Sequence, residues 1–118
     1  MDPIIVRPES EQPIPPYAKR VFKGVIFDVY QWEQEMFNGT KKTFERMRRP
    51  DTTVVIPVTP EGKIVVTEQE QPGMKLFIGV AGGRGELDEE PLQGAKRELL
   101  EETGYESDAW ALWLAIKV

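Results

Sequence analysis

Residues 82–105 read GGRGELDEEPLQGAKRELLEETGY, a segment with glycines at both ends and seven carboxylate side chains. Pro91 suits the first position of a helix, and Gly104 suits the position just past its end. Apolar residues recur between them at intervals of three and four, at Leu92, Ala95 and Leu99. That spacing gives one apolar face and predicts a helix over residues 91–103.

The same helix carries acidic residues on another face. Glu98, Glu101 and Glu102 stand at positions i, i+3 and i+4, within an arc of roughly 100°. Such carboxylates repel one another unless a positive charge lies between them, and Mg²⁺ or Mn²⁺ prefers oxygen ligands of this kind. Arg97 lies four residues before Glu101 and can pair with it. A solvated acidic face is the alternative, and it is the commoner explanation of a short acidic helix.

The spacing of nine residues is more specific than an acidic face alone. They follow the pattern G-x5-E-x7-R-E-U-x-E-E-x-G-U, where U is a bulky apolar residue: Gly83, Glu89, Arg97, Glu98, Leu99, Glu101, Glu102, Gly104 and Tyr105. At about 5–10% usage per residue type, a chance match at the seven positions other than U is far rarer than roughly one in a million. The chain therefore resembles the Nudix hydrolases, whose signature this is. Tyr105 stands where an aliphatic residue is commoner.

The resemblance implies a loop–helix–loop that binds Mg²⁺ or Mn²⁺, and attack by water on a diphosphate linkage in a nucleoside diphosphate joined to another group X. It assigns catalysis to Arg97, Glu98, Glu101 and Glu102, and metal binding to Gly82, Glu98, Glu101 and Glu102. Arg97 would orient Glu101, Gly82 would offer its carbonyl, and Glu89 would support the site. The other acidic residues of the segment, Glu86, Asp88 and Glu90, are expected to be solvated.

Composition limits the other chemistry open to the chain. It has 118 residues, a net charge of −5, no cysteine and no histidine. Thiolate sites, disulfides and histidine bases are thereby excluded, and the charge gives no general footprint for a nucleic-acid polymer or an anionic membrane. No apolar run approaches the roughly 18 residues of a membrane span, and the N-terminus does not resemble a secretory signal. We expect a cytoplasmic protein.

Three segments are expected along the chain. Residues 1–20 read as a Pro-rich extended lead-in, and residues 21–50 as strands with a hairpin at Asn38-Gly39, a two-residue turn signal. Residues 51–118 are expected to form a partial Nudix core, with the signature at 83–105.

Strands are also expected within that core. Residues 52–58 and 63–71 read as an antiparallel pair, residues 76–83 as a short strand that runs into glycines, and residues 108–118 as an apolar closing strand. Several strands, one helix and a final strand indicate an α+β class. With the resemblance, we expect a Nudix-type α/β/α sandwich with a mixed sheet, incomplete at the C-terminus.

The resemblance extends over about residues 24–109 and is strongest to the ADP-ribose pyrophosphatase branch. In that branch the N-terminal strands form dimers, which implies a homodimer. Trp32 is then a candidate for stacking on a base, and Arg49, with Arg46 and Arg48, for meeting phosphate or ribose. Packing of Trp32 in a core and solvation of the arginines are the alternatives. Gln71 is a further substrate-binding candidate, at a position where the branch usually has an arginine.

The expected function is metal-dependent hydrolysis of a nucleoside diphosphate derivative, ADP-ribose or a nucleotide sugar above others. A repair role on oxidised nucleoside triphosphates stays open, because the signature does not specify X. Only 13 residues follow Tyr105, whereas a Nudix domain normally continues with further strands. We therefore expect an incomplete or dimer-completed domain, and the alternative function is a nucleotide-binding or assembly module without full catalysis.

Overall fold

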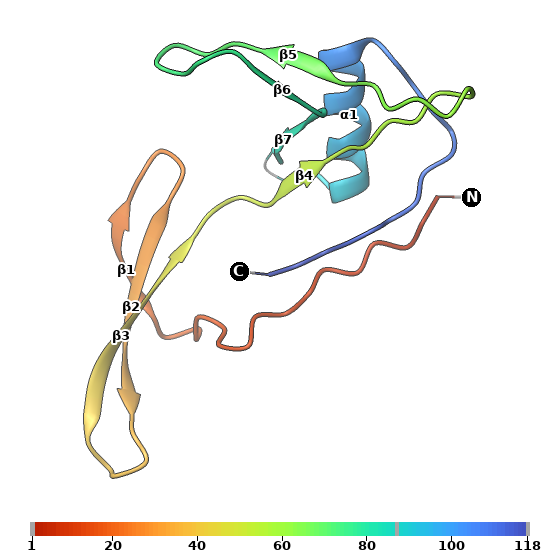
Figure 1. Ribbon diagram of the computed structural model, residues 1–118. Coiled ribbons are helices and arrows are strands. Elements are labelled where there is room, and N and C mark those ends of the chain that lie inside the picture. The colour runs from red at the N-terminus through yellow and green to blue at the C-terminus, as the bar shows by residue number, and fades with distance from the viewer. Residues whose placement is uncertain (1, 87, 118) are drawn as a thin grey trace. The chain divides into compact units, whose positions relative to one another are not determined.

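The computed structural model describes residues 2–86 and 88–117. Over these residues the chain forms, in order, β1 (Lys19–Lys23), β2 (Asp28–Glu35), β3 (Lys41–Arg48), β4 (Thr52–Val54), β5 (Thr67–Gln69), β6 (Phe77–Gly79), β7 (Gly82–Arg84) and α1 (Pro91–Thr103) (Figure 1). The elements belong to two compact units. One comprises Met1–Ile5 and Asp51–Trp113, and the other comprises Val6–Pro50 and Leu114–Val118.

Strands β1, β2 and β3 form an antiparallel sheet in that order. Trp32 lies opposite Phe44, its ring meets that of Phe44 edge-on at 5.8 Å between centroids, and only 5% of Trp32 is exposed. The hairpin predicted at Asn38-Gly39 is confirmed, but Glu35 pairs with Lys41, so five residues join the strands. The turn is wider than the two-residue signal predicted.

The other unit contains two short ladders, β4 with β7 and β5 with β6, both antiparallel. The predicted pairing of residues 52–58 with 63–71 is wrong for most of its length, since a single bridge joins Val58 to Ile64. β4 pairs instead with glycine-containing β7. A Cβ on Gly82 would overlap the carbonyl oxygen of Thr53, so the bare glycine backbone allows this close approach.

In the described part of the chain, three small antiparallel sheets stand where one mixed sheet was predicted. Pro57 and Pro72 each follow a strand end by three residues. Proline has no amide donor, so it cannot extend a ladder. The content of short strands with one helix is the α+β class that the sequence predicted.

Helix α1 begins and ends where the sequence predicted. Pro91 occupies its first position, and the amide of Glu90 donates to the side-chain oxygen of Gln93 at 3.4 Å. Gly104 adopts the left-handed conformation with φ 76°, and its amide donates to the carbonyl of Leu100 at 2.9 Å. Both ends are thus fixed by the residues that indicated them. At 13 residues, α1 is not long and apolar enough to cross a membrane, and the described residues contain no helix that is.

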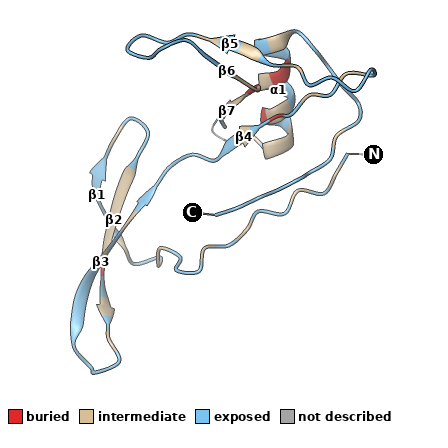
Figure 2. Ribbon diagram, in the orientation of Figure 1, coloured by how far each residue is buried: buried red, intermediate tan, exposed pale blue. Residues whose placement is uncertain are grey.

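A small core holds α1 against the strands of its unit (Figure 2). Leu99 is buried with Val55 and Ala81, and Ala95 and Trp110 pack against them. This contact orients the helix, so that its apolar side faces β4 and β7 and its acidic residues lie beside the β7 glycines.

The closing strand predicted over residues 108–118 is absent from its described part, residues 108–117. Trp110 packs on the core instead, and its Nε1 donates to the carbonyl of Ser107 at 2.8 Å. An apolar run becomes a strand only where a neighbouring strand pairs with its backbone.

Candidate active site

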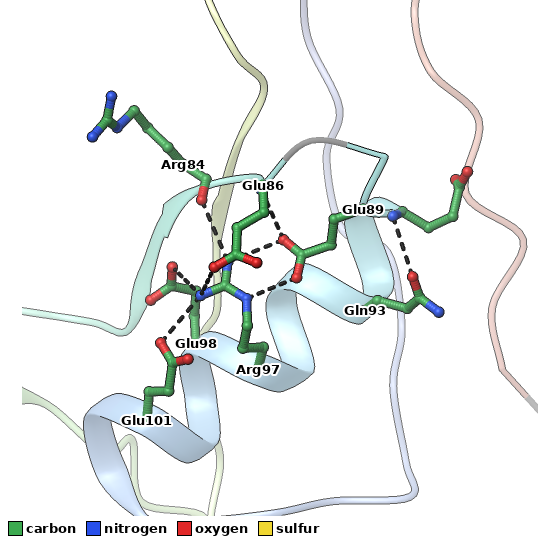
Figure 3. Close-up of polar contacts among 8 residues, drawn as sticks. Arg84, Glu86, Glu89, Gln93, Arg97, Glu98 and Glu101 are labelled. Atoms are coloured by element: carbon green, nitrogen blue, oxygen red, sulfur yellow. Dashed lines mark hydrogen bonds and ion pairs between the residues drawn. The ribbon is translucent and has the colours of Figure 1, made fainter. Parts of the chain in front are cut away.

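Arg97 lies at the centre of a group of carboxylates on and before α1 (Figure 3). Its Nε donates to Oε2 of Glu89 at 2.7 Å and its Nη2 donates to Oε1 at 3.0 Å, a bidentate pair. Its Nη1 donates to Glu98 and to Glu101, each at 3.1 Å. The planar guanidinium suits this arrangement, because its fixed fork of donors can engage several carboxylates at once.

Glu89 ties the loop before α1 to the helix. Besides Arg97, its Oε1 accepts from the amide of Glu86 at 3.0 Å. The hydrogen bond from Arg97, followed by that from the Glu86 amide, lowers the pKa of Glu89 from 4.5 to about 2. The bonds to Glu89 and its negative charge likewise raise the pKa of Arg97. Both groups are therefore charged near neutral pH, and the loop is held to the helix by an ion pair.

Glu98 and Glu102 lie against the glycine backbone of β7. Oε2 of Glu102 accepts from the amide of Gly82 at 3.2 Å, and a Cβ placed on Gly83 would stand 2.7 Å from Oε1 of Glu98. Burial raises the pKa of Glu98, and the charges of Glu102 and Glu101 raise it further, against the lowering effect of Arg97. Negative charge is thus concentrated beside the closely packed glycine backbone of β7, where the absence of a side chain on Gly83 leaves room for the carboxylate of Glu98.

The carboxylates of Glu98, Glu101 and Glu102 are chemically suited to a divalent cation, since carboxylate oxygens are the hard ligands that Mg²⁺ and Mn²⁺ take. As the side chains stand, however, no three acidic residues in 2–86 and 88–117 are grouped closely enough to hold a metal ion. Arg97 explains the difference from the predicted convergence, because it binds Glu98 and Glu101. The carboxylate of Glu101 is also more than half exposed. Gly82 meets Glu102 through its amide, whereas the sequence assigned a role to its carbonyl.

Two of the predicted substrate-binding residues belong to the other unit. Trp32 donates through Nε1 to Gln34 at 3.1 Å and is buried against Phe44, an arrangement that matches the core alternative. The guanidinium of Arg49 lies 5.7 Å from the ring centre of Phe27.

The remaining arginines of that group also have partners. Arg48 lies 4.8 Å over the ring of Tyr30, and Arg46 donates to the carbonyl of Gln12 at 2.6 Å. Gln71 belongs to the unit that contains α1, is exposed in the turn after β5, and accepts the amide of Met74 at 3.1 Å through its carbonyl.

Two contacts of Arg97 were not predicted from the sequence. Glu86 is exposed, as expected, but its carboxylate also lies 3.8 Å from Nη1 of Arg97. The bidentate pairing of Glu89 with Arg97 was also missed. Glu89 and Arg97 are both fixed positions of the signature, so the sequence marked each of them. It did not show that they meet, because they are eight residues apart and belong to a loop and a helix.

Comparisons with known proteins agree with the signature. A family model described as NUDIX domain matches residues 47–115, more than half of the chain. The ADP-ribose pyrophosphatase of Bacillus subtilis (strain 168) is 36% identical over 88 residues, which are 74% of this chain and 48% of that protein. The Methanol dehydrogenase activator of Bacillus methanolicus is 36% identical over 92 residues, 77% of this chain and 50% of that protein. The chain spans about half the length of the curated relatives it matches.

Proposed function

The chain belongs to the Nudix family, and from that membership we propose that it hydrolyses the diphosphate linkage of a nucleoside diphosphate derivative in the presence of Mg²⁺ or Mn²⁺. One observation carries the proposal. Glu98 and Glu102 lie side by side against glycine backbone, where burial and like charge raise the pKa of Glu98. A cation at this face would relieve the repulsion and bring positive charge to a diphosphate.

The roles of the side chains follow from their positions. Glu98 and Glu102 would hold the cation beside Gly82, with Glu101 able to reach it on leaving Arg97. The bound cation would supply neutralisation of the diphosphate and a lower pKa for the attacking water. Arg97 fixes the directions of Glu98 and Glu101 through its hydrogen bonds, and Glu89 fixes Arg97.

ADP-ribose and nucleotide sugars are the substrates we propose first. The name of the Bacillus subtilis relative supports ADP-ribose. Trp32 and Arg49 stay proposals for binding a base and a phosphate. Gln71 would offer an amide where the branch usually has a fixed positive charge, which favours neutral sugar hydroxyls over phosphate as its partner.

Three further features belong to the same proposal. A homodimer would cover exposed apolar side chains of the β1–β2–β3 unit, among them Phe22 and Val25. The α/β/α sandwich with segments 1–20, 21–50 and 51–118 stays a prediction of the sequence. A cytoplasmic location stays a prediction as well.

A second function is favoured by the other relative. The similarity to a protein named Methanol dehydrogenase activator supports a nucleotide-binding or assembly module.

The test is hydrolysis of a mixed panel of ADP-ribose, nucleotide sugars, dinucleoside polyphosphates and nucleoside triphosphates, with Mg²⁺, with Mn²⁺ and with chelator. Glu98→Gln and Glu102→Gln keep the shape of the side chains and remove one charge each. We expect each to lower turnover at least about 100-fold without unfolding the protein. Glu106→Gln is the matched control, because Glu106 is exposed and lies outside the signature.

Unchanged rates in both variants would overturn the proposed hydrolysis. Binding of a nucleotide from the panel, with no turnover under any metal condition, would favour the second function.

A further inference from the structure

Two neighbouring residues cross the gap between the short ladders of the unit that contains α1. β6 ends at Gly79 and β7 begins at Gly82, so Val80 and Ala81 lie between the β5–β6 ladder and the β4–β7 ladder. Gly82 follows this junction directly in the chain, and its amide donates to Oε2 of Glu102 at 3.2 Å. The backbone at the junction is therefore part of what positions the site.

Side chains of β5 hold this junction in place. Nε2 of Gln69 donates to the carbonyl of Val80 at 3.3 Å and to Oγ1 of Thr67 at 3.0 Å. Oγ1 of Thr67 in turn donates to the carbonyl of Gly79 at 3.3 Å. Both hydrogens of the Gln69 amide are thus used, and two successive carbonyls before Ala81 accept bonds from β5.

The fit of Gln69 depends on a glycine. A Cβ on Gly79 would lie 2.9 Å from Nε2 of Gln69, so the bare backbone gives the amide its path to Val80. Both Thr67 and Gln69 are half-buried, whereas Glu68 between them is exposed on the opposite face of the strand. A half-buried polar group with its hydrogen bonds satisfied has a fixed position, which a solvated side chain does not.

We propose that Gln69, assisted by Thr67, is a positioning residue that fixes the Val80–Ala81 junction and so holds Gly82 and Gly83 against Glu98 and Glu102. The inference rests on the proposed function, because it assigns a metal to that face. It predicts that loss of the Gln69 amide weakens metal binding without removing any ligand, as loss of a supporting hydrogen bond does in other metal sites.

The test uses Mn²⁺ alone as the probe, with its affinity measured by electron paramagnetic resonance on folded protein. We expect Gln69→Leu to weaken Mn²⁺ binding about 10-fold, within the range for supporting residues. Glu68→Gln, the neighbour on the exposed face, should bind as wild type. Thr67→Val should weaken binding, and Thr67→Ser should restore it, since serine keeps the hydroxyl.

A purely structural role would lower the melting temperature of Gln69→Leu and leave the Mn²⁺ affinity of the folded protein unchanged, and that result would overturn the inference. If Gln69→Leu does not fold, wild-type affinity in Thr67→Val overturns it equally. Glu102→Gln separates the proposed function from the role of Gln69. If wild type binds Mn²⁺, Glu102→Gln does not and Gln69→Leu does, the proposed function stands and the role of Gln69 is overturned. If wild type does not bind Mn²⁺, both the proposed function and the role of Gln69 are overturned.

Discussion

The guanidinium of Arg97 donates hydrogen bonds to three carboxylates, and the geometry of its fork makes this possible. Two nitrogens hold Glu89 and a third contacts Glu98 and Glu101. An ammonium group has its three donors on one compact centre and cannot span the same positions. A positive charge without the guanidinium fork is therefore not expected to hold all three carboxylates.

Arg97→Lys tests whether the fork is needed. We expect kcat to fall between about 10- and 100-fold with KM little changed, because the carboxylates lose their fixed directions while the substrate contacts remain. Steady-state kinetics on the preferred substrate give both constants. Lys96→Arg, an exchange in the opposite direction at the exposed adjacent residue, should leave kcat as in wild type. Equal activity of Arg97→Lys and wild type would show that a positive charge alone suffices.

The charge of Glu89 should make the folding stability depend on pH, in the direction that its lowered pKa sets. The folded-state pKa of Glu89, about 2, lies below the ordinary value of 4.5. The ionised carboxylate therefore stabilises the folded state fully above pH 4.5, and this stabilisation is lost as the pH falls towards 2. Urea unfolding of wild type and Glu89→Gln between pH 7 and pH 3 measures it. The stability difference between the two should shrink as the pH falls below about 4.5. A difference that stays constant over this range would show that the charge of Glu89 does not contribute.

The sequence supplies the candidate residues on α1, whereas it indicates only part of the arrangement that the structure shows for them. The spacing of Glu98, Glu101 and Glu102 placed them on one helical face, because a helix converts spacing into direction. The sharing of Arg97 between the loop and the helix was not predictable, since it depends on how the loop before α1 folds back. The bonds of Gln69 depend on a junction between two ladders, and no local pattern marks it.

The sequence predicted the bounds of helix α1 better than it predicted which strands pair. The signals for α1 are local: Pro91 at its start, Gly104 at its end and the apolar spacing between. Strand pairing is not local. β4 could pair with the segment after the next turn or with a segment nearly 30 residues later, and the bare glycines of β7 favoured the second. The same limitation explains the closing strand that did not form.

Two glycines with positive φ give a matched test of the β4–β7 contact. Gly39 in the hairpin has open space around it, so Gly39→Ala should cost about 1 kcal/mol from its left-handed backbone alone. A Cβ on Gly82 would overlap the backbone of Thr53, so Gly82→Ala should cost about 3 kcal/mol. Chemical denaturation measures both. Equal costs would mean that the close approach of β7 to β4 is not needed for stability.

Few apolar side chains are buried in the part of the chain that the structure describes. Among the described residues the buried hydrophobic side chains are Trp32, Val55, Ala81 and Leu99, while many large ones are exposed. In the β1–β2–β3 unit, 59% of Phe22 and 99% of Val25 are exposed. Apolar surface of this kind is typical of an interaction site, and it supports the proposed homodimer.

Sedimentation equilibrium tests the dimer. The chain has a mass of 13.5 kDa, so the expected value for wild type is twice that. Phe22→Glu places a charge on the exposed apolar surface and should return the mass to that of one chain. Lys19→Glu, a charge change on the same strand without loss of apolar surface, is the control. A single-chain mass for wild type at micromolar concentration would contradict the homodimer.

The proposed reaction is attack of water, assisted by a cation at the acidic face of α1, on a diphosphate linkage. This reaction can be tested by hydrolysis of ADP-ribose in water enriched in ¹⁸O, with the products analysed by mass spectrometry. Attack of water on one phosphorus forms a new P–O bond and breaks the bridging one, so we expect one ¹⁸O per turnover, in AMP or in ribose 5-phosphate. This labelling should require Mg²⁺ or Mn²⁺ and should be lost in Glu102→Gln. Labelled products that form equally fast in chelator or in Glu102→Gln, or no labelled product with either metal, would contradict it.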